Sequence, residues 1–237
     1  MKEIAKILFG SQNMGLDGPT SDRDYKVIYT PSFEDLYFRR EADQHSLKGY
    51  DKDHYAPIDI RKFHKLALEG NVNIVEMLFS IDIQSSLPEF NDYLNKVKEL
   101  YNRGYIAYVW DKFYSSLQGL VMNSLDRYGP TRKVIARAHA YIRLSQTIAI
   151  DSFCVNETSW RDNPWNKTAR EMRFDETVWA PSAEQIKETL NYLKILLGEA
   201  AQSNQNPISL KLFEEEKIKL QNCIYNIVKI NMEEPYV

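Results

Sequence analysis

Apolar positions in the first quarter of the chain form the short runs that are typical of strands. The run at residues 4–9 ends at a glycine, and a second run at residues 24–30 follows a loop rich in glycine. A third stretch, at residues 57–60, sets Asp59 between two isoleucines, and successive side chains of a strand point to opposite faces. The pattern therefore predicts three short strands that are bounded by turns.

The remaining apolar positions predict helices. The segment 31–41 predicts a short helix for which Ser32 is the expected N-cap, and residues 61–70 and 71–80 predict two more helices. Beyond these segments, apolar residues recur at steps of three and four. This spacing covers residues 89–104, 110–127, 130–153, 182–200 and 209–230.

We therefore expect an α+β fold, in which a small unit with a mixed β-sheet at residues 1–87 precedes an all-helical unit at residues 88–237. The composition, with 43% apolar and 27% charged residues, is ordinary for a globular protein. No apolar run approaches the roughly 20 residues of a membrane-spanning helix, so we expect no membrane partner and a cytoplasmic location. Cys154 and Cys223 form no metal-binding cluster and are expected to be buried thiols in a reducing compartment.

Two carboxylates stand close together where the second strand begins. Asp22 and Asp24 are two residues apart, so both side chains leave the same face of a strand. Carboxylates this close repel each other, and a divalent cation between them relieves the repulsion. Asp59, on a neighbouring strand, could face the same point, and three such carboxylates could hold two Mg²⁺ ions about 4 Å apart. The alternative from these residues alone is a solvent-exposed pair at a strand edge.

The first strand ends in Gly10 and Ser11, where backbone N–H groups and a hydroxyl could contact a phosphate. This pair, a spacer of ten residues, the Asp22-x-Asp24 pair and the later Asp59 together resemble the signature of the DNA polymerase β-type nucleotidyltransferase superfamily. The segments RKFHKLALEGNVNIVEMLFS and RAHAYIRLSQTI are similar to the predicted nucleotidyltransferases that are associated with bacterial and phage RNA-repair systems.

The resemblance implies a role for each of these residues. Gly10 and Ser11 would hold the β- and γ-phosphates of an NTP, and Asp22 and Asp24 would bind two metal ions, Mg²⁺ or Mn²⁺. Asp59 would complete one metal site and help to deprotonate the attacking hydroxyl. That hydroxyl would attack the α-phosphate of the NTP and release pyrophosphate, and the resemblance favours an RNA end as the acceptor.

The helical half contains a second candidate feature. Arg132, His139 and Arg143 recur at helical spacing on one face, and such a row is costly to bury unless an anion meets it. We expect this row to close the cleft opposite the aspartates and to bind the nucleotide, and the repair-associated family carries a similar His-x-x-x-Arg. The alternative is an ordinary solvated helix face. Lys133 and Arg137 lie on the neighbouring stripe and are expected to face solvent.

Basic residues are concentrated in one part of the chain. Residues 127–173 hold 9 basic and 4 acidic side chains, which suits a phosphate-bearing partner or is merely uneven surface charge. Within this part, residues 160–173 mix two tryptophans with four basic residues. Such a segment could bind nucleic acid, with the tryptophans stacked on nucleobases and the basic residues on phosphates. The alternative is a loop that the two tryptophans pack onto the core. His45, His54 and His64 have no ligand-like spacing and are expected to be surface or internally satisfied histidines.

The function expected from the sequence is a Mg²⁺-dependent nucleotidyltransferase that uses an NTP and acts on an RNA end. A second interpretation keeps the reaction and changes the acceptor to a protein hydroxyl or a small molecule. A third is a catalytically silent nucleotide- or RNA-binding module. The chain departs from the superfamily pattern at Arg23, between the two aspartates, and in lacking a helix before the first strand. The sequence leaves the NTP, the acceptor and the oligomeric state open.

Overall fold

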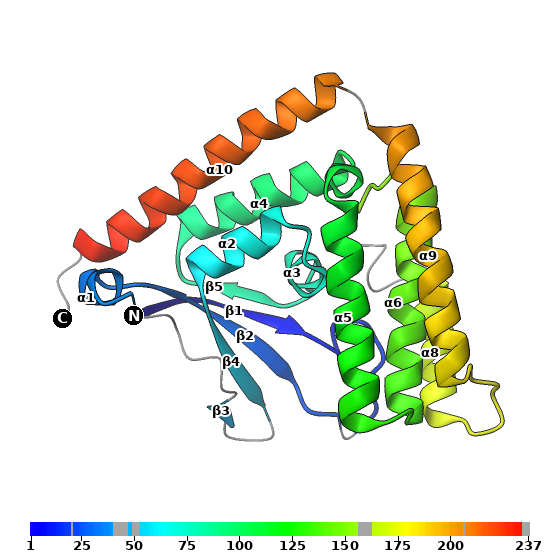
Figure 1. Cartoon of the computed structure of the whole chain (residues 1–237). Coiled ribbons are helices and arrows are strands. Elements are labelled where there is room, and N and C mark those ends of the chain that lie inside the picture. Colours follow the sequence, from blue (N-terminus) through cyan, green and yellow to red (C-terminus); the bar gives the residue numbers. More distant parts are fainter. Residues whose placement is uncertain (20, 40–46, 49–52, 156–162, 206, 234–237) are drawn as a thin grey trace.

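The computed structural model describes residues 1–19, 21–39, 47–48, 53–155, 163–205 and 207–233. Its architecture is α+β, as predicted, with a mixed sheet and a large helical region that follows it in the chain (Figure 1). The bundle of α5, α6, α8 and α9 stands to one side of the sheet, and α10 runs back across α4 and α2.

The sheet has the strand order β3-β4-β2-β1-β5. Its strands are β1 (Lys2–Phe9), β2 (Asp24–Thr30), β3 (Leu47–Lys48), β4 (His54–Asp59) and β5 (Ile83–Ser85). β1 pairs antiparallel with β2 and with β5, whereas β2 pairs parallel with β4. Because β1 and β2 run in opposite directions, the end of β1 and the start of β2 lie at the same edge, where Phe9 is opposite Asp24. The two short strands β3 and β5 were not predicted.

Three helices follow closely on the strands and carry side-chain caps at their N-termini. They are α1 (Phe33–Tyr37), α2 (Ile60–Leu68) and α3 (Val72–Leu78). Ser32 caps α1 in a reciprocal capping box with Asp35, which confirms the predicted cap. Asp59 caps α2 and Asn71 caps α3, so the strand and the turn that precede these helices also fix where they begin.

The helical region begins directly after β5. Its elements are α4 (Pro88–Asn102), the 3₁₀ helix η2 (Tyr105–Tyr108), α5 (Trp110–Tyr128), α6 (Arg132–Ile150), α8 (Pro164–Phe174), α9 (Ala183–Asn204) and α10 (Pro207–Glu233). Five of the helices were predicted from their apolar spacing, and α8 was not. All the strands that the structure describes lie within residues 1–87.

One continuous apolar core joins the sheet to the helices. It includes Ile28 of the sheet, Phe63 of α2, Tyr93 of α4 and Leu117 of α5. Hydrogen bonds cross the same boundary, because the hydroxyl of Tyr101 donates to the carbonyl of Ala67 at 2.6 Å. The change in secondary structure near residue 87 therefore does not divide the core.

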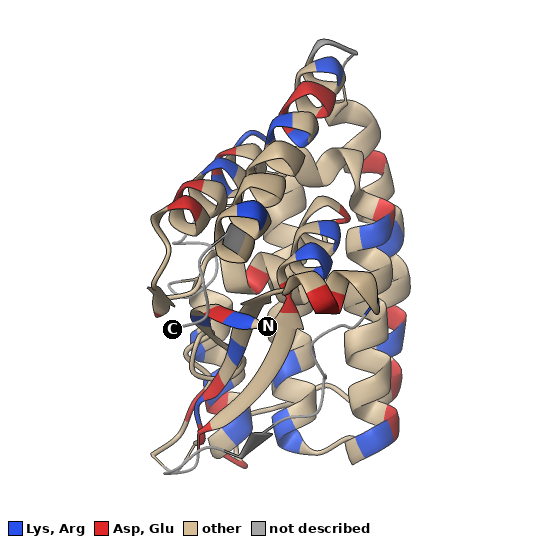
Figure 2. Ribbon diagram, turned by 90° about the vertical axis from the view of Figure 1, so that its left-hand side faces the viewer, with Lys and Arg blue, Asp and Glu red and all other residues tan. Residues whose placement is uncertain are grey.

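Two predictions from composition can be compared with the structure. Among the described residues, no helix combines the length and the apolar character that crossing a membrane requires. Cys154 and Cys223 are free thiols, but both are partly exposed rather than buried as predicted. Figure 2, which faces the left-hand side of Figure 1, shows acidic and basic residues interspersed along the helices. The ion pair between Lys217 and Glu214 of α10 is one example.

Candidate functional site

The structure brings Asp22 and Asp24 together at the start of β2. Asp24 lies opposite His54 of β4 in the parallel register, and Asp22 Oδ2 is 3.5 Å from His54 Nε2. Asp24 shares its strand face with Ile28, which is part of the core under the helices. Asp24 therefore faces the helical half of the molecule, and the solvent-exposed strand edge that was the alternative does not describe it. Asp22, just before the strand, is exposed.

Gly10 closes the other side of this edge. Its φ of +81° is in the left-handed region, and a Cβ there would lie 3.2 Å from Asp24 Oδ2. The N–H of Gly10 donates to Glu76 Oε1, so this donor is directed into the protein and not toward a phosphate. The glycine thus permits a close approach of the turn to Asp24, and any phosphate contact from this turn falls to Ser11 and the residues after it.

A buried network lies beneath the Gly10 turn. Glu76 of α3 is fully buried, and it also accepts a hydrogen bond from the hydroxyl of Tyr141 of α6. Burial raises the pKa of Glu76, and the nearby Arg137 opposes that rise. Arg137 Nη2 donates to the Tyr141 hydroxyl at 3.3 Å. The sequence analysis missed this network, although a lone acid within the apolar run of residues 72–79 was a usable signal.

Two cations of α6 lie near Asp24. Burial raises the pKa of Asp24, and His54, Arg137 and Lys133 lower it in that order. Lys133 is exposed, as predicted, but Arg137 is partly buried, so the prediction that Arg137 faces solvent is wrong. The stripe at steps of four that contains Arg137 and Tyr141 points toward the sheet, because Tyr141 must reach Glu76.

The predicted row of Arg132, His139 and Arg143 faces the other way. Arg132 donates to three backbone carbonyls at the end of α8 and just beyond it, at 2.6–2.8 Å. Arg143 lies over the ring of Trp165, 5.2 Å from its centroid, and its Nε donates to His139 Nε2 at 3.3 Å. The prediction that this row closes the cleft opposite the aspartates is therefore wrong, since these residues pack against α8 and α9.

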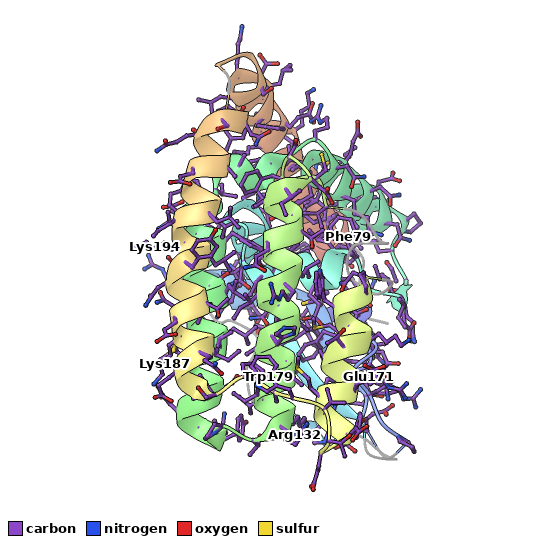
Figure 3. All side chains as sticks on the ribbon, turned by 90° about the vertical axis from the view of Figure 1, so that its right-hand side faces the viewer. Phe79, Arg132, Glu171, Trp179, Lys187 and Lys194 are labelled. Carbon is purple, nitrogen blue, oxygen red and sulfur yellow. The ribbon has the colours of Figure 1, made fainter. Side chains whose placement is uncertain are left out.

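The surroundings of this row are visible from the bundle side. Figure 3 shows α6 between α9 and α8, with Arg132 and Trp179 both at the lower end of the bundle. His139 and Arg143 line a small hollow of about 220 Å³ with Trp179. Burial and, to a smaller extent, the nearby Arg143 lower the pKa of His139 to about 4, so the imidazole is neutral at pH 7.

Asp59 does not join the carboxylate pair. In the register of β2 and β4 it lies opposite Tyr29, five residues along β2 from Asp24, which is about 16 Å at ~3.3 Å per residue. Its side chain caps α2 and binds the guanidinium of Arg61 through both oxygens, at 2.9 and 2.6 Å. The prediction that Asp59 is a third metal ligand and aids deprotonation is therefore wrong, and the residue has a structural role.

Two of the three predicted carboxylates, Asp22 and Asp24, lie at the sheet edge as candidate ligands of a divalent cation. No group of three or more His, Cys, Asp or Glu side chains suited to a metal occurs in the part of the chain that the structure describes. Mg²⁺ is commonly held by only one or two carboxylates, with waters and substrate phosphates completing its shell. Asp22 and Asp24 meet that requirement, and the close approach of Gly10 leaves room beside Asp24 that a side chain would fill.

A cavity of about 480 Å³ lies between α5 and α6 and includes the cations that face Asp24. Its lining is formed by Leu120, Val121, Ser124, Tyr128, Thr131, Lys133, Val134, Arg137, Ala138 and Tyr141. The size is within the range of small-molecule sites, and a mostly apolar wall with a few convergent polar groups is typical of them. Arg137 Nε is buried and has no hydrogen-bond partner among the described residues, so it is a donor that a ligand would satisfy.

The Trp/Arg-rich segment forms a helix where the structure describes it. Residues 160–162 lie outside the described residues, and residues 164–174 form α8, which packs against α6. Trp165 lies over Arg143, as described above. Among the predicted histidines, His64 is buried between Tyr93 and Gln221, as a satisfied histidine should be, and His45 lies outside the described residues.

Comparisons with known proteins give no relative. No protein-family model, no curated protein and no solved structure matches this chain. The function must therefore be argued from the sheet edge, the buried network beneath it and the cavity beside it.

Proposed function

We propose that the protein is a metal-dependent nucleotidyltransferase that moves an NMP from an NTP to a hydroxyl. The observation that carries this proposal is the arrangement of opposite charges across one edge of the sheet. Asp22 and Asp24 lie on one side, and Lys133 and Arg137 of α6 lie on the other, next to a cavity large enough for a nucleoside. A nucleotide with a bound cation is the ligand that this arrangement suits, because its phosphates need both a metal and cationic side chains.

In this proposal the chain uses one cation rather than the two expected from the sequence. Mg²⁺ or Mn²⁺ bound to Asp22 and Asp24 would neutralise phosphate charge during displacement at the α-phosphate. Arg137 and Lys133 bind the remaining phosphate charge from the side of the helices, and the base enters the apolar part of the cavity. Glu76 holds the Gly10 turn against Asp24 and, through Tyr141, orients Arg137.

The proposed acceptor is an RNA end, which rests on the resemblance of residues 61–80 and 137–148 to the repair-associated family. A catalytically silent nucleotide- or RNA-binding module is the second candidate. The observation that favours it is the distance of Asp59 from the carboxylate pair, which leaves the site without a third carboxylate among the described residues.

The test incubates the protein with each α-³²P-labelled NTP, Mg²⁺ or Mn²⁺, and separately RNA, protein lysate or small metabolites. Transfer of label to RNA supports the proposal. Transfer to protein or to a small molecule supports the reaction but shows that the acceptor is not RNA. The variant with Asp22→Asn and Asp24→Asn should abolish transfer, whereas Asp59→Asn is the matched acidic control and should retain it once folding is verified. Saturable NTP binding without transfer to any acceptor identifies the silent module.

A further inference from the structure

The loop between Gly10 and Asp22 joins the two halves of the candidate site. Within it, the N–H of Leu16 donates to the carbonyl of Ser11 at 2.8 Å, and the N–H of Gly18 donates to Ser21 Oγ at 2.8 Å. The first part of the loop is anchored in the core, because Asn13 bonds the backbone of Glu76 and Ile81, and Met14 and Leu16 are buried. The part after Leu16 is not buried in this way, and a segment with few buried contacts opens more easily. The position of Asp22 relative to Gly10 therefore depends on what else holds this loop.

Helix α8 holds it from outside. Arg173 Nη1 donates to the carbonyl of Leu16, and Arg170 Nε donates to the carbonyl of Asp17 at 3.0 Å. The ring of Phe174 covers Gly18 so closely that a Cβ there would lie 2.7 Å from it. Three successive residues of the loop are thus held by the last two turns of one helix, and two of the contacts are charge-assisted hydrogen bonds.

The same helix is fastened to the bundle. Arg132, at the start of α6, donates to the carbonyls of Met172, Asp175 and Val178, and therefore binds both the end of α8 and the turn after it. Ala169 and Met172 are buried between the helices. The connection therefore runs from α6 through α8 to the loop that leads to Asp22.

Arg173 also belongs to the electrostatic surroundings of the site. Burial lowers the pKa of Arg173, Asp17 raises it, and Arg137 lowers it. The effect of Arg137 shows that the two guanidinium groups are near each other. Helix α8 thus supplies a cation close to Arg137, and that cation is occupied by the loop.

We propose that α8 is a positioning strap: Arg170 and Arg173 fix residues 16–18 to the bundle, and this contact sets the carboxylate pair in its cation-binding arrangement. The effect on cation binding and transfer rests on the proposed function, but the effect on the loop does not. This assignment gives the Trp/Arg-rich segment a role in holding protein backbone. Nucleobase stacking, the other use of such a segment, becomes an outcome of the test.

The experiment compares the full-length wild-type chain with Arg170→Met/Arg173→Met and with Lys167→Met. Lys167 lies on the same helix with an exposed side chain, so its variant is the matched control for loss of a positive charge. Hydrogen exchange of the loop amides, Mn²⁺ affinity and RNA affinity are measured for each protein. In the double variant, amides of residues 16–18 should exchange at least about tenfold faster, because the loss of even one of the two charge-assisted hydrogen bonds predicts that change. Mn²⁺ should bind about tenfold more weakly, and the control should match the wild type.

Each outcome decides the proposal. Unchanged loop exchange in the double variant overturns it, and so does a loosened loop with unchanged Mn²⁺ affinity. A loss of RNA affinity with an unaltered loop assigns the segment to nucleic-acid binding instead. If the wild-type chain binds no Mn²⁺, the proposed function is wrong. The strap is then tested by the hydrogen exchange of the loop amides alone. Gly18→Ala, which displaces Phe174 from the loop side, should loosen the same amides and serves if the double variant does not fold.

Discussion

Helix α6 carries two neighbouring stripes of polar side chains, and they have different surroundings. The inner stripe, Lys133, Arg137 and Tyr141, faces the sheet edge, where Arg137 and Tyr141 connect Asp24 to the buried Glu76. The outer stripe faces α8 and α9, where Arg132 binds backbone carbonyls and Arg143 lies over the ring of Trp165. Both stripes have the spacing of one helical face. The difference between them shows that a row of cations acquires its role from the element packed against it.

The largest effect is expected from removing the anchor of the inner stripe. Glu76→Leu deletes the acceptor of the Gly10 N–H and the Tyr141 hydroxyl, and leaves Arg137 without its buried counter-charge. Breaking such a buried pair costs about 3–5 kcal/mol of unfolding free energy. Urea denaturation measures it, with Glu99→Leu on the exposed side of α4 as the control. A cost below about 1 kcal/mol would mean that the inner stripe does not depend on Glu76.

His139 of the outer stripe should make the free energy of unfolding depend on pH. The pKa of His139 is about 4 in the fold and about 6.5 when unfolded, so the unfolded chain binds more protons between these values. Stability from this group is present above pH 6.5 and is lost as the pH falls toward 4, by roughly 3 kcal/mol in total. The difference between wild type and His139→Asn, followed by thermal melting across this range, isolates it. Parallel pH profiles for the two proteins would rule it out.

Nucleotide affinity should separate the two stripes directly. Arg137→Met should weaken NTP binding about 10- to 150-fold, the range for losing a hydrogen bond to a charged group, about 1.5–3 kcal/mol. Arg143→Met removes the same charge from the outer stripe and should leave NTP affinity unchanged. Isothermal titration of both variants measures the contrast. The reverse order of effects would return the nucleotide site to the outer stripe.

The smallest effect is expected at Lys133, the exposed end of the inner stripe. Lys133→Ala should weaken NTP binding about two- to fivefold, because an exposed cation contributes little. The loss should shrink as salt is raised, since screening already weakens such an interaction. Titrations at low and high ionic strength measure it, and Lys167→Ala is the control. A loss that does not change with salt would place Lys133 in a buried contact.

The sequence predicted the elements that have strong local signals. Strand β2 lies at the predicted residues, and the Ser32 cap is present as predicted. Strand β5 has only three residues, and only three side chains of α8 are buried. Neither element therefore shows a clear period of apolar residues in the sequence. The three-residue β5 gains its order from pairing with β1, which is a tertiary contact that local pattern does not contain.

The candidate site was predicted in part. The Gly-Ser turn and the Asp22-x-Asp24 pair carry local information, because residues two apart in the chain stay close in space wherever the segment lies. The predicted strand face holds for Asp24 alone, since β2 begins at Asp24 and Asp22 precedes it. The prediction for Asp59 was wrong because the position of this residue depends on the register of β4 against β2. The sequence of neither strand determines that register by itself. The prediction that the outer stripe of α6 faces the aspartates was wrong for a similar reason. Which stripe faces the sheet depends on how the whole helix is rotated in the bundle, and this is a tertiary property.

The return of α10 over α2 has a consequence for how the chain is made. His64 has one ring partner in α4, but its other, Gln221, lies 157 residues further along the chain. At a synthesis rate of about 5–20 residues per second, roughly 8–30 s separate these two residues on the ribosome. During that interval the sheet and α2 lack the helix that covers them, and their apolar surface is open to other chains. Closure of this core therefore waits for α10, and its apolar surface is at risk of aggregation until α10 has been made.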